Sequence, residues 1–365
     1  MQTMSHEPAT LLTPDVLATQ PLDHARALPA RFYTDPCMPE LDRRAVFAHG
    51  WQLVCHQSQL AASGDHVVVE MSGLPLLIVR GEDGTIRALH NVCRHRAGPI
   101  ARCDGRGAKV LRCHYHGWTY ALDGVLRSAP EMNSAPDFVA SEIRLPQARV
   151  TIWQGLVFVA TGDVPEFADV VAGIDARLGA QSLAGYLHHH HASYDVACNW
   201  KVYVDNYLEG YHVPHIHPTL NAVLDYRSYV TATADWHSWQ YSPLESNDTL
   251  YGSGDALYYF LYPNTMLNIL PGRLQTNRVL PLGVDRCRIE FDFFYAPDDN
   301  DTAQARRTMD LEFSDAVQVE DVTICEEVQR GLASGSYLPG RLNPLRENAV
   351  HHFHELLRRA YRESE

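Results

Sequence analysis

The sequence predicts an α+β protein with two domains, a small all-β domain followed by a larger domain of helices and antiparallel strands. Two observations lead to this fold class. Residues 46–160 consist of short apolar runs separated by turn signals such as Gly-Glu-Asp-Gly at 81–84. Residues 161–365 contain longer strand-like runs, and the stretch from Ala303 to Leu332 has few helix breakers. This stretch predicts one long helix near the end of the chain.

The elements follow in a simple order along the chain. Residues 1–45 are rich in proline and biased towards helix, so they predict a surface segment packed on the larger domain. The strands expected in the small domain are Trp51–Cys55, His66–Glu70, Leu76–Arg80, Ile86–His90 and Thr119–Gly124. The strands expected in the larger domain are Tyr258–Leu270, Leu274–Leu282 and Arg286–Tyr295. The run His188–His191 predicts a solvated or sheet-edge position, because neighbouring side chains of a strand point to opposite faces.

Composition limits the function classes. The 365 residues carry a formal net charge of −14 and no marked basic run, which argues against nucleic acid or an anionic membrane as partner. An acidic surface would also be compatible with a basic redox partner. No apolar run approaches the roughly 18–20 residues of a membrane span, and Met1–Pro14 lacks a signal-peptide pattern. The eight scattered cysteines predict a reducing, cytoplasmic location rather than a disulfide framework.

Two short motifs carry the strongest chemical signal. Cys93 and His95 form C-x-H, Cys113 and His116 form C-x2-H, and 17 residues separate His95 from Cys113. Two thiolates for one iron and two imidazoles for the other are the ligands of a Rieske [2Fe–2S] cluster. Zinc is the competing interpretation, but Cys2His2 zinc sites usually keep like ligands together. The alternating order therefore favours the iron–sulfur cluster.

The surroundings of these motifs agree with a cluster held by two loops. Each motif follows or precedes a strand-like run, and Gly-Pro at 98–99 turns the first loop. His114 lies inside the second motif, but the C-x2-H spacing favours His116 as the ligand. Cys103 lies between the motifs and is interpreted as a loop or packing residue rather than a fifth ligand.

A second site is predicted between residues 199 and 218. On a helix, Asp205, Glu209 and His212 fall at i, i+4 and i+7 and share one face. Pro214 should end or kink this helix, so that His217 on the exit turn can approach His212. Two imidazoles and a carboxylate with open positions make the facial triad of non-haem Fe(II) oxygenases.

The carboxylate of the triad is predicted on the long C-terminal helix. Asp321 shares a helical stripe with Val317, Ile324 and Val328, and a buried carboxylate needs a partner or a metal. Pairing with a core arginine or lysine is the alternative for Asp321, and hydrogen-bonded core histidines are the alternative for the two imidazoles. Glu320 points roughly 100° off the stripe. His215 stays open as a replacement for His217 or as a supporting residue.

Together these residues resemble the catalytic subunits of Rieske non-haem iron oxygenases over roughly residues 30–360. Both motifs contribute, C-x-H-x17-C-x2-H and then Asp-Asn-Tyr-x-Glu-x-Tyr-His-x4-His beginning at Asp205. The chain is most similar to the choline monooxygenase branch, which acts on quaternary ammonium compounds, through segments at 205–208, 211–214, 276–283, 317–322, 325–326, 328–332 and 351–354. The spacing at Glu209-Gly210-Tyr211 is shorter than in the plant enzymes and closer to bacterial relatives acting on betaines and carnitine.

The resemblance implies a fold, an assembly and roles for residues. The fold would be a Rieske β domain joined to a helix-grip catalytic domain, and the assembly a head-to-tail homotrimer. Electrons would pass between subunits through Glu209, which would bridge His116 of one subunit and His212 of the next, with Asp205 as the runner-up. Asp205, Asn206 and Glu209 are thus the catalytic residues that the motif implies, beside a mononuclear iron held by His212, His217 and Asp321.

The implied reaction needs O2, a small substrate and electrons from a separate NAD(P)H-dependent reductase containing flavin or iron–sulfur centres. The preferred interpretation is a monooxygenase that hydroxylates or N-demethylates a quaternary ammonium compound such as choline, betaine or carnitine. Aromatic residues of the larger domain suit such a cation, although they also serve as core residues. An aromatic-ring hydroxylating oxygenase is the second interpretation and a plain electron-transfer protein the third. The chain length argues against the third, since a cluster domain alone needs only about 100 residues.

Overall fold

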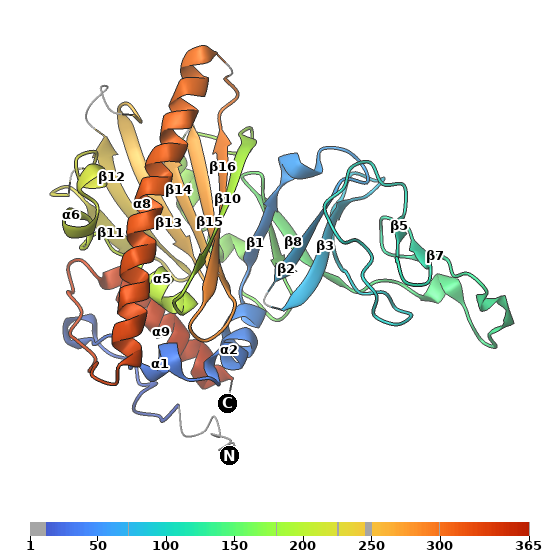
Figure 1. Cartoon of the computed structure of the whole chain (residues 1–365), viewed down its shortest axis with the longest axis horizontal. Helices are drawn as coiled ribbons and strands as arrows, with labels where there is room; N and C mark the ends of the chain where they lie inside the picture. The colour runs from blue at the N-terminus through green and yellow to red at the C-terminus, as the bar shows by residue number, and fades with distance from the viewer. Residues whose placement is uncertain are drawn as a thin grey trace. The chain divides into compact units, whose positions relative to one another are not determined.

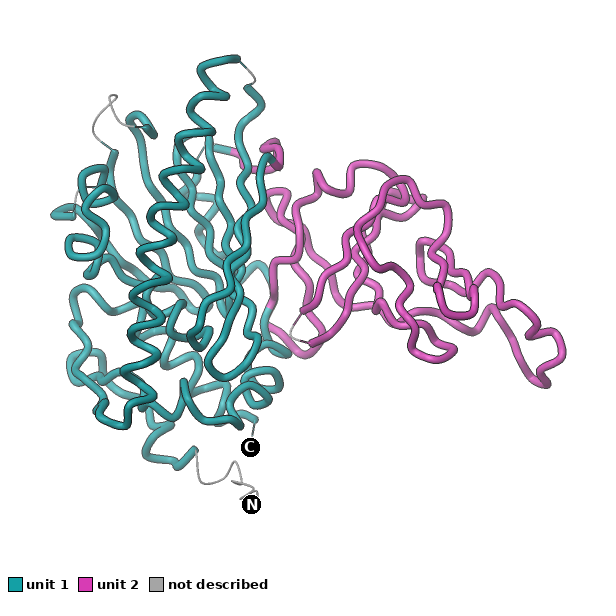
Figure 2. The backbone as a smooth tube through the Cα atoms, viewed as in Figure 1, with its two compact units in different colours: residues 1–50, 165–181, 189–365 teal, residues 51–164, 182–188 magenta. Residues whose placement is uncertain are grey.

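A computed structural model of the chain is shown in Figure 1. It describes residues 12–71, 73–179, 181–224, 226–244, 250–298 and 300–364. Residues 1–11 of the expected N-terminal segment therefore lie outside the described residues. The chain divides into two compact units, coloured separately in Figure 2. The larger unit comprises residues 1–50, 165–181 and 189–365, and the smaller unit comprises residues 51–164 and 182–188.

The smaller unit is built from two antiparallel sheets. A six-stranded sheet has the order β1-β9-β8-β4-β3-β2, and a three-stranded sheet has the order β5-β6-β7. Their strands are β1 Gln52–His56, β2 His66–Met71, β3 Leu74–Arg80, β4 Ile86–His90, β5 Leu111–Arg112, β6 Thr119–Tyr120, β7 Leu126–Ser128, β8 Gln147–Trp153 and β9 Leu156–Ala160. The predicted turn at 81–84 joins β3 to β4, which pair in antiparallel register. The four strands expected before residue 91 are confirmed.

The strand expected at Thr119–Gly124 is shorter than predicted. Only Thr119 and Tyr120 pair with β5, and the chain then turns through Gly124, whose φ is 86°. The Asp-Gly pair therefore starts the turn earlier than the alternating pattern suggested. Tyr120 and Trp118 are buried in the core that also receives Cys93 and Cys113.

The larger unit is organised around a seven-stranded antiparallel sheet. Its order is β10-β16-β15-β14-β13-β12-β11. The strands are β10 Leu187–Val196, β11 Val230–Thr233, β12 His237–Leu244, β13 Gly254–Leu261, β14 Thr265–Leu270, β15 Arg273–Pro281 and β16 Cys287–Tyr295. The helices of this unit are α1 Arg31–Thr34, α2 Met38–Leu41, α3 Phe167–Val170, α4 Ile174–Leu178, α5 Trp200–Tyr207, α6 Val213–Ile216, α7 Pro218–Asn221, α8 Asp301–Ala333 and α9 Asn348–Glu363. Figure 1 shows α8 running along the sheet, and α5 contacts both α8 and β15.

The strands, the long helix and the histidine run predicted for the larger domain can be compared with this unit. The expected strand Tyr258–Leu270 is wrong as a single element, because Tyr262, Pro263 and Asn264 form a turn between β13 and β14. Proline has no N–H to donate and interrupts the ladder there. The two strands expected after it and the long helix are confirmed as β15, β16 and α8. The run His188–His191 lies in the edge strand β10, as expected, and His191 contacts Asp292 at 3.0 Å.

Both ends of the described chain contribute to the core of the larger unit. Phe32 of α1 and Tyr361 of α9 are fully buried and their ring centroids lie 5.8 Å apart. Asp42 is buried beneath them and accepts hydrogen bonds from Lys201 Nζ, Trp200 Nε1 and Tyr361 Oη. This buried ion pair ties the N-terminal segment and α9 to the start of α5. None of the described helices is long and apolar enough to cross a membrane.

The long helix α8 buries a different line of side chains from the predicted stripe. Gln318, Cys325 and Gln329 are buried, whereas Val328 is 44 % exposed. The buried line of side chains on α8 is therefore shifted by about one residue around the helix from the predicted stripe Val317-Asp321-Ile324-Val328. Asp321 lies at the margin of the buried line, with its side chain 16 % exposed.

Candidate functional site

Two similar turns hold the four predicted cluster ligands of the smaller unit. The Ala97 N–H donates to the Cys93 carbonyl at 3.0 Å, and the Gly117 N–H donates to the Cys113 carbonyl at 3.1 Å. The last residue of each turn is left-handed, with φ of 54° at Ala97 and 74° at Gly117. The two motifs are thus folded as near copies, each presenting a cysteine at its first position.

The turns bring the four side chains together. The rings of His95 and His116 lie 4.6 Å apart between centroids, and His95 stacks on Trp118 at 4.8 Å with an interplanar angle of 7°. Nδ1 of His95 is buried without a hydrogen-bond partner. A buried ring nitrogen with no partner is costly unless it binds a metal, so this atom fits a cluster ligand. His114 is exposed, as is Cys103.

The electrostatics of these loops also suit metal binding. Desolvation, His95 and Arg96 lower the pKa of His116, which favours the neutral imidazole that a metal requires. Burial raises the pKa of Cys93, and the Tyr120 hydroxyl opposes that rise from 3.2 Å away. A bound iron would supply the positive charge that keeps this buried thiolate ionised.

The second site lies where α5 ends, and here the helical prediction is wrong. The structure ends α5 at Tyr207, so Glu209 and His212 are not on a helix with Asp205. His212 precedes the short helix α6 and His217 follows it, while Pro214 lies in the first turn of α6. In the loop that follows α5, Gly210 packs tightly on Tyr229, where an added Cβ would lie 2.6 Å from the ring. The two histidines therefore face each other across α6, with ring centroids 5.1 Å apart.

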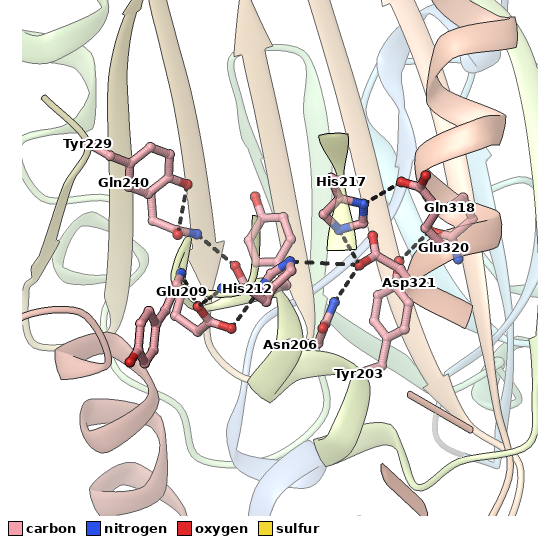
Figure 3. Close-up of polar contacts among 12 residues, drawn as sticks. Tyr203, Asn206, Glu209, His212, His217, Tyr229, Gln240, Gln318, Glu320 and Asp321 are labelled. Carbon is pink, nitrogen blue, oxygen red and sulfur yellow. Dashed lines mark hydrogen bonds and ion pairs between the residues drawn. The ribbon is translucent and has the colours of Figure 1, made fainter. Parts of the chain in front are cut away.

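Each of these histidines is held by a carboxylate (Figure 3). His212 Nδ1 lies 2.6 Å from Glu209 Oε1, and His217 Nδ1 lies 2.7 Å from Glu320 Oε2. A carboxylate can only accept there, so each ring donates its Nδ1–H and is left with the Nε2 lone pair. This is the carboxylate–histidine arrangement that orients metal ligands.

The two free Nε2 atoms converge on Asp321. Oδ1 of Asp321 lies 3.0 Å from His217 Nε2 and 3.9 Å from His212 Nε2, and one ligand atom from each residue falls within 4.8 Å of the others. A lone pair facing a carboxylate oxygen at 3.0 Å needs a proton or a cation between them. Two ligands at about 2.1 Å from one metal and at right angles also lie about 3.0 Å apart. The three residues therefore fit a metal ion.

Neighbouring groups fix Asp321 in this position. Asn206 Nδ2 donates to Asp321 Oδ1 at 2.7 Å. Among the residues that the structure describes, Asp321 contacts His212, His217 and Asn206 and forms no ion pair with an arginine or lysine, which the alternative required. Burial alone would lower the pKa of His217, but hydrogen bonds to Asp321 and Glu320 outweigh it and the pKa is raised. The site thus attracts positive charge to this ring.

Two predicted residues lie elsewhere. Asp205 is outside the group of three and accepts hydrogen bonds from Tyr33 Oη at 2.6 Å and His354 Nε2 at 3.0 Å. His215 is exposed and outside the group of three.

Glu320 is the functional residue that the sequence reasoning missed. Its position beside Asp321 was visible, but its placement 100° off the stripe hid its contact with His217.

A pocket opens beside the three converging residues and encloses about 850 Å³ of empty space, part of it open to solvent. Its walls come from α5, α8 and strands β12–β16, and they include His212, His217 and Asp321 themselves. The aromatic residues of the wall are Tyr203, Tyr207, Tyr229, Tyr251, Tyr258, Phe291 and Phe313. This combination of apolar rings, a few polar groups and a metal-type cluster is typical of a small-molecule site.

Comparisons with known proteins agree with both sites. Residues 50–146 match the Rieske [2Fe-2S] domain, and residues 183–363 match the catalytic domain described as ring hydroxylating alpha subunit. The first match spans both cluster motifs and leaves the zinc interpretation without support.

Three individual proteins show the extent of the similarity. The chain is 38 % identical to the chloroplastic choline monooxygenase of Arabidopsis thaliana, over 92 % of this chain and 83 % of that one. It is 29 % identical to the carnitine monooxygenase oxygenase subunit of Escherichia coli K12, over 99 % and 100 % of the two chains. A solved quaternary ammonium Rieske monooxygenase, described for carnitine oxidation and inter-subunit electron transfer, superposes with a TM-score of 0.86 at 25 % identity, covering 94 % and 99 %.

Proposed function

This chain belongs to the Rieske non-haem iron oxygenases, and on that basis we propose that it oxidises a small quaternary ammonium compound with O2. As an enzyme of this family it carries a Rieske [2Fe–2S] cluster and a mononuclear iron. The observation that carries the proposal is the pocket, which joins the His212-His217-Asp321 group to a wall of aromatic rings. The family membership also removes the third interpretation, a plain electron-transfer protein.

We assign the cluster to Cys93, His95, Cys113 and His116, and the mononuclear iron to His212, His217 and Asp321. When bound, the cluster supplies single electrons and the iron activates oxygen beside the substrate. The chain's own residues prepare that site. Glu209 and Glu320 fix the orientation and tautomer of the two imidazoles, and Asn206 holds the Asp321 carboxylate from 2.7 Å.

The substrate class rests on the pocket wall and on the relatives. Tyrosine faces attract an alkylammonium group by roughly 0.5–2 kcal/mol each, and several of them line this pocket. The choline and carnitine monooxygenases are named for substrates of this type. An aromatic acid remains the second substrate class, because rings also stack on arenes.

Glu209 is our proposed bridge for electrons between subunits. It lines the pocket beside His212, His217 and Asp321, which we call the iron-side pocket, and it also lines a second pocket. Asn206 and His212 line both pockets as well. The Oε1 of Glu209 contacts His212 Nδ1 and its Oε2 accepts from the backbone N–H groups of Tyr211 and His212, while its side chain is 13 % exposed. Asp205, the runner-up, contacts Tyr33 and His354 rather than His212.

This assignment implies an assembly and a partner. We propose a head-to-tail homotrimer in which His116 of one subunit approaches Glu209 of the next, and a separate NAD(P)H-dependent reductase with flavin or iron–sulfur centres that reduces the cluster. We also propose a cytoplasmic location, since thiolate ligands and scattered free cysteines suit a reducing compartment.

A single-turnover experiment tests the proposal. The cluster of the purified protein is reduced chemically, and O2 is added with choline, glycine betaine, carnitine or benzoate before products are identified by mass spectrometry. Oxidised choline, or a demethylated or cleaved betaine, is the expected result. Hydroxylated benzoate with every ammonium compound unchanged would replace the proposed substrate class and leave the metal assignments in place.

A further inference from the structure

Resting on the proposed function, we infer that Arg273 and Ser314 bind an anionic end of the substrate, so that the enzyme acts on betaines at a carbon attached to nitrogen. Arg273 is the one arginine or lysine among the described residues that line the iron-side pocket. It is the first residue of β15 and is 5 % exposed. The position of Arg273 therefore determines where positive charge lies along the pocket.

The pocket extends along α8 away from the iron ligands. Ser314 and Asp321 both line it, and they are seven residues apart on the same helix. At 1.5 Å per residue this separation is about 10 Å along the helix axis. Arg273 Nη2 donates to Ser314 Oγ at 2.8 Å, so the guanidinium lies at the end of the pocket remote from Asp321.

The end near the iron ligands is negative. Asp321, Glu209 and Glu320 are all within contact of the two imidazoles, and three carboxylates exceed the charge of a divalent ion by one. Tyr203 and Tyr207 lie on the same face of α5 as Asn206, which donates to Asp321, and all three line the pocket. Negative charge and aromatic faces together suit a quaternary ammonium group at this end.

The remote end is positive towards the pocket. Asp310 binds Arg273 Nε at 2.6 Å. Arg273 lines both the iron-side pocket and a second cavity, whereas Asp310 lines only the second cavity. Of this ion pair, the positive member alone therefore borders the iron-side pocket. The guanidinium carbon also lies 5.4 Å from the ring centroid of Tyr251, so the face of this ring already makes a cation–π contact with Arg273. Nε of Arg273 already donates to Asp310, and Nη2 donates to Ser314 and Gln275. An ammonium group at this end would meet a like charge, whereas a carboxylate would meet an opposite charge.

A zwitterionic substrate would accordingly lie with its ammonium near the iron and its carboxylate near Arg273. Oxidation then falls on a carbon bonded to nitrogen. One C–H bond breaks and one C–O bond forms with an atom of O2. The second oxygen atom becomes water by taking two protons and two electrons, which NAD(P)H supplies through the reductase. The C–N bond of the resulting carbinol then breaks, with its electron pair staying on nitrogen and the hydroxyl proton passing to solvent, so a methyl group leaves as formaldehyde.

The test compares betaines with choline in the reduced holoenzyme. For the wild type we expect a KM about tenfold or more lower for glycine betaine, carnitine or γ-butyrobetaine than for choline, with an aldehyde and an amine as products. The double variant Arg273→Gln, Asp310→Asn removes both charges and keeps an acceptor for Tyr251 and Tyr295, which donate to Asp310. It should raise KM for betaines at least about tenfold and leave KM for choline unchanged or lower.

Two further variants keep the test decisive. If the double variant loses its cluster absorption, Ser314→Ala replaces it in the test. This variant leaves the Arg273–Asp310 ion pair intact, and it should raise KM for betaines a few-fold and leave KM for choline unchanged. Arg278→Gln is the matched control, because Arg278 lies on the same strand, pairs with Glu290 at 2.7 Å and does not line the pocket. A lower wild-type KM for choline, or equal changes for choline and betaines in the variants, would overturn the inference while the proposed function stands. Oxidation of benzoate alone would instead remove the proposed function.

Discussion

Glu320 provides the sharpest test of how this chain holds its mononuclear iron. Its Oε2 lies 2.7 Å from His217 Nδ1, and His217 is 1 % exposed whereas the Glu320 side chain is 38 % exposed. Glu320→Ala removes the acceptor and leaves a buried N–H without a partner, so the ring loses both its orientation and its basicity. Outer carboxylates of this kind change metal affinity by about 10–100-fold, which corresponds to about 1.4–2.8 kcal/mol. Glu320→Gln keeps an acceptor and should cost less.

The assay is iron binding rather than turnover. Each variant is freed of mononuclear iron and titrated with Fe(II), while the visible absorption of the cluster reports that the other metal site is intact. Glu327→Gln is the matched control, because Glu327 lies on the same helix and only forms an exposed ion pair with Arg330 at 3.7 Å. An unchanged Fe(II) affinity in Glu320→Ala would refute the assignment of Glu320 as the partner of an iron ligand.

Three other predictions follow from particular contacts. Lys201→Met leaves Asp42 buried with Trp200 and Tyr361 as its remaining donors. In denaturant titrations this change should lower the free energy of unfolding of the larger unit by about 3–5 kcal/mol. A loss of less than about 1 kcal/mol would contradict the role given to this ion pair. Tyr120→Phe removes a hydroxyl that lies 3.2 Å from Cys93 Sγ. The loss of about 1 kcal/mol of hydrogen bonding should lower the reduction potential of the cluster by about 40 mV. An unchanged potential in a redox titration would show that the hydroxyl does not donate to the bound sulfur. Burial lowers the pKa of His352 from 6.5 to about 4. Between pH 6.5 and pH 4 this histidine is therefore protonated in the unfolded chain and neutral in the folded chain. The free energy of unfolding consequently falls as the pH drops towards 4. At pH 5 the loss should be about 2 kcal/mol relative to pH 7, and His352→Gln should remove that part of the pH dependence in thermal unfolding measured across this range.

The sequence was informative where spacing alone constrains chemistry. The two cluster motifs needed no knowledge of the fold, because C-x-H and C-x2-H each place their ligands within one turn. The pairing of Glu209 with His212 was also expected, yet for a reason that proved wrong. They meet through a loop closed by Gly210 and Tyr229, not through a helical face. Close sequence spacing brought them together in either conformation.

The rest of the site depends on contacts between distant segments. Glu320 reaches His217 across 103 residues, and Tyr33 and His354 engage Asp205 from opposite ends of the chain. No periodicity encodes such pairs. The apolar stripe of α8 placed Asp321 near the buried side, but the helix is rotated so that polar Gln318 and Gln329 are buried instead of Val328. Polar groups of the pocket and of α5 form hydrogen bonds with the buried glutamines of α8, and a pattern of apolar residues does not predict such contacts.

The central claim is that electrons stored at Cys93, His95, Cys113 and His116 are used at His212, His217 and Asp321. The most direct measurement follows cluster reoxidation and product in one rapid-quench experiment, on the wild type and on His217→Ala. With O2 and a quaternary ammonium substrate, the wild type should reoxidise its cluster and form product together. His217→Ala should keep its cluster and its absorption but form no product. Product formation by a His217→Ala protein that lacks mononuclear iron would contradict the account.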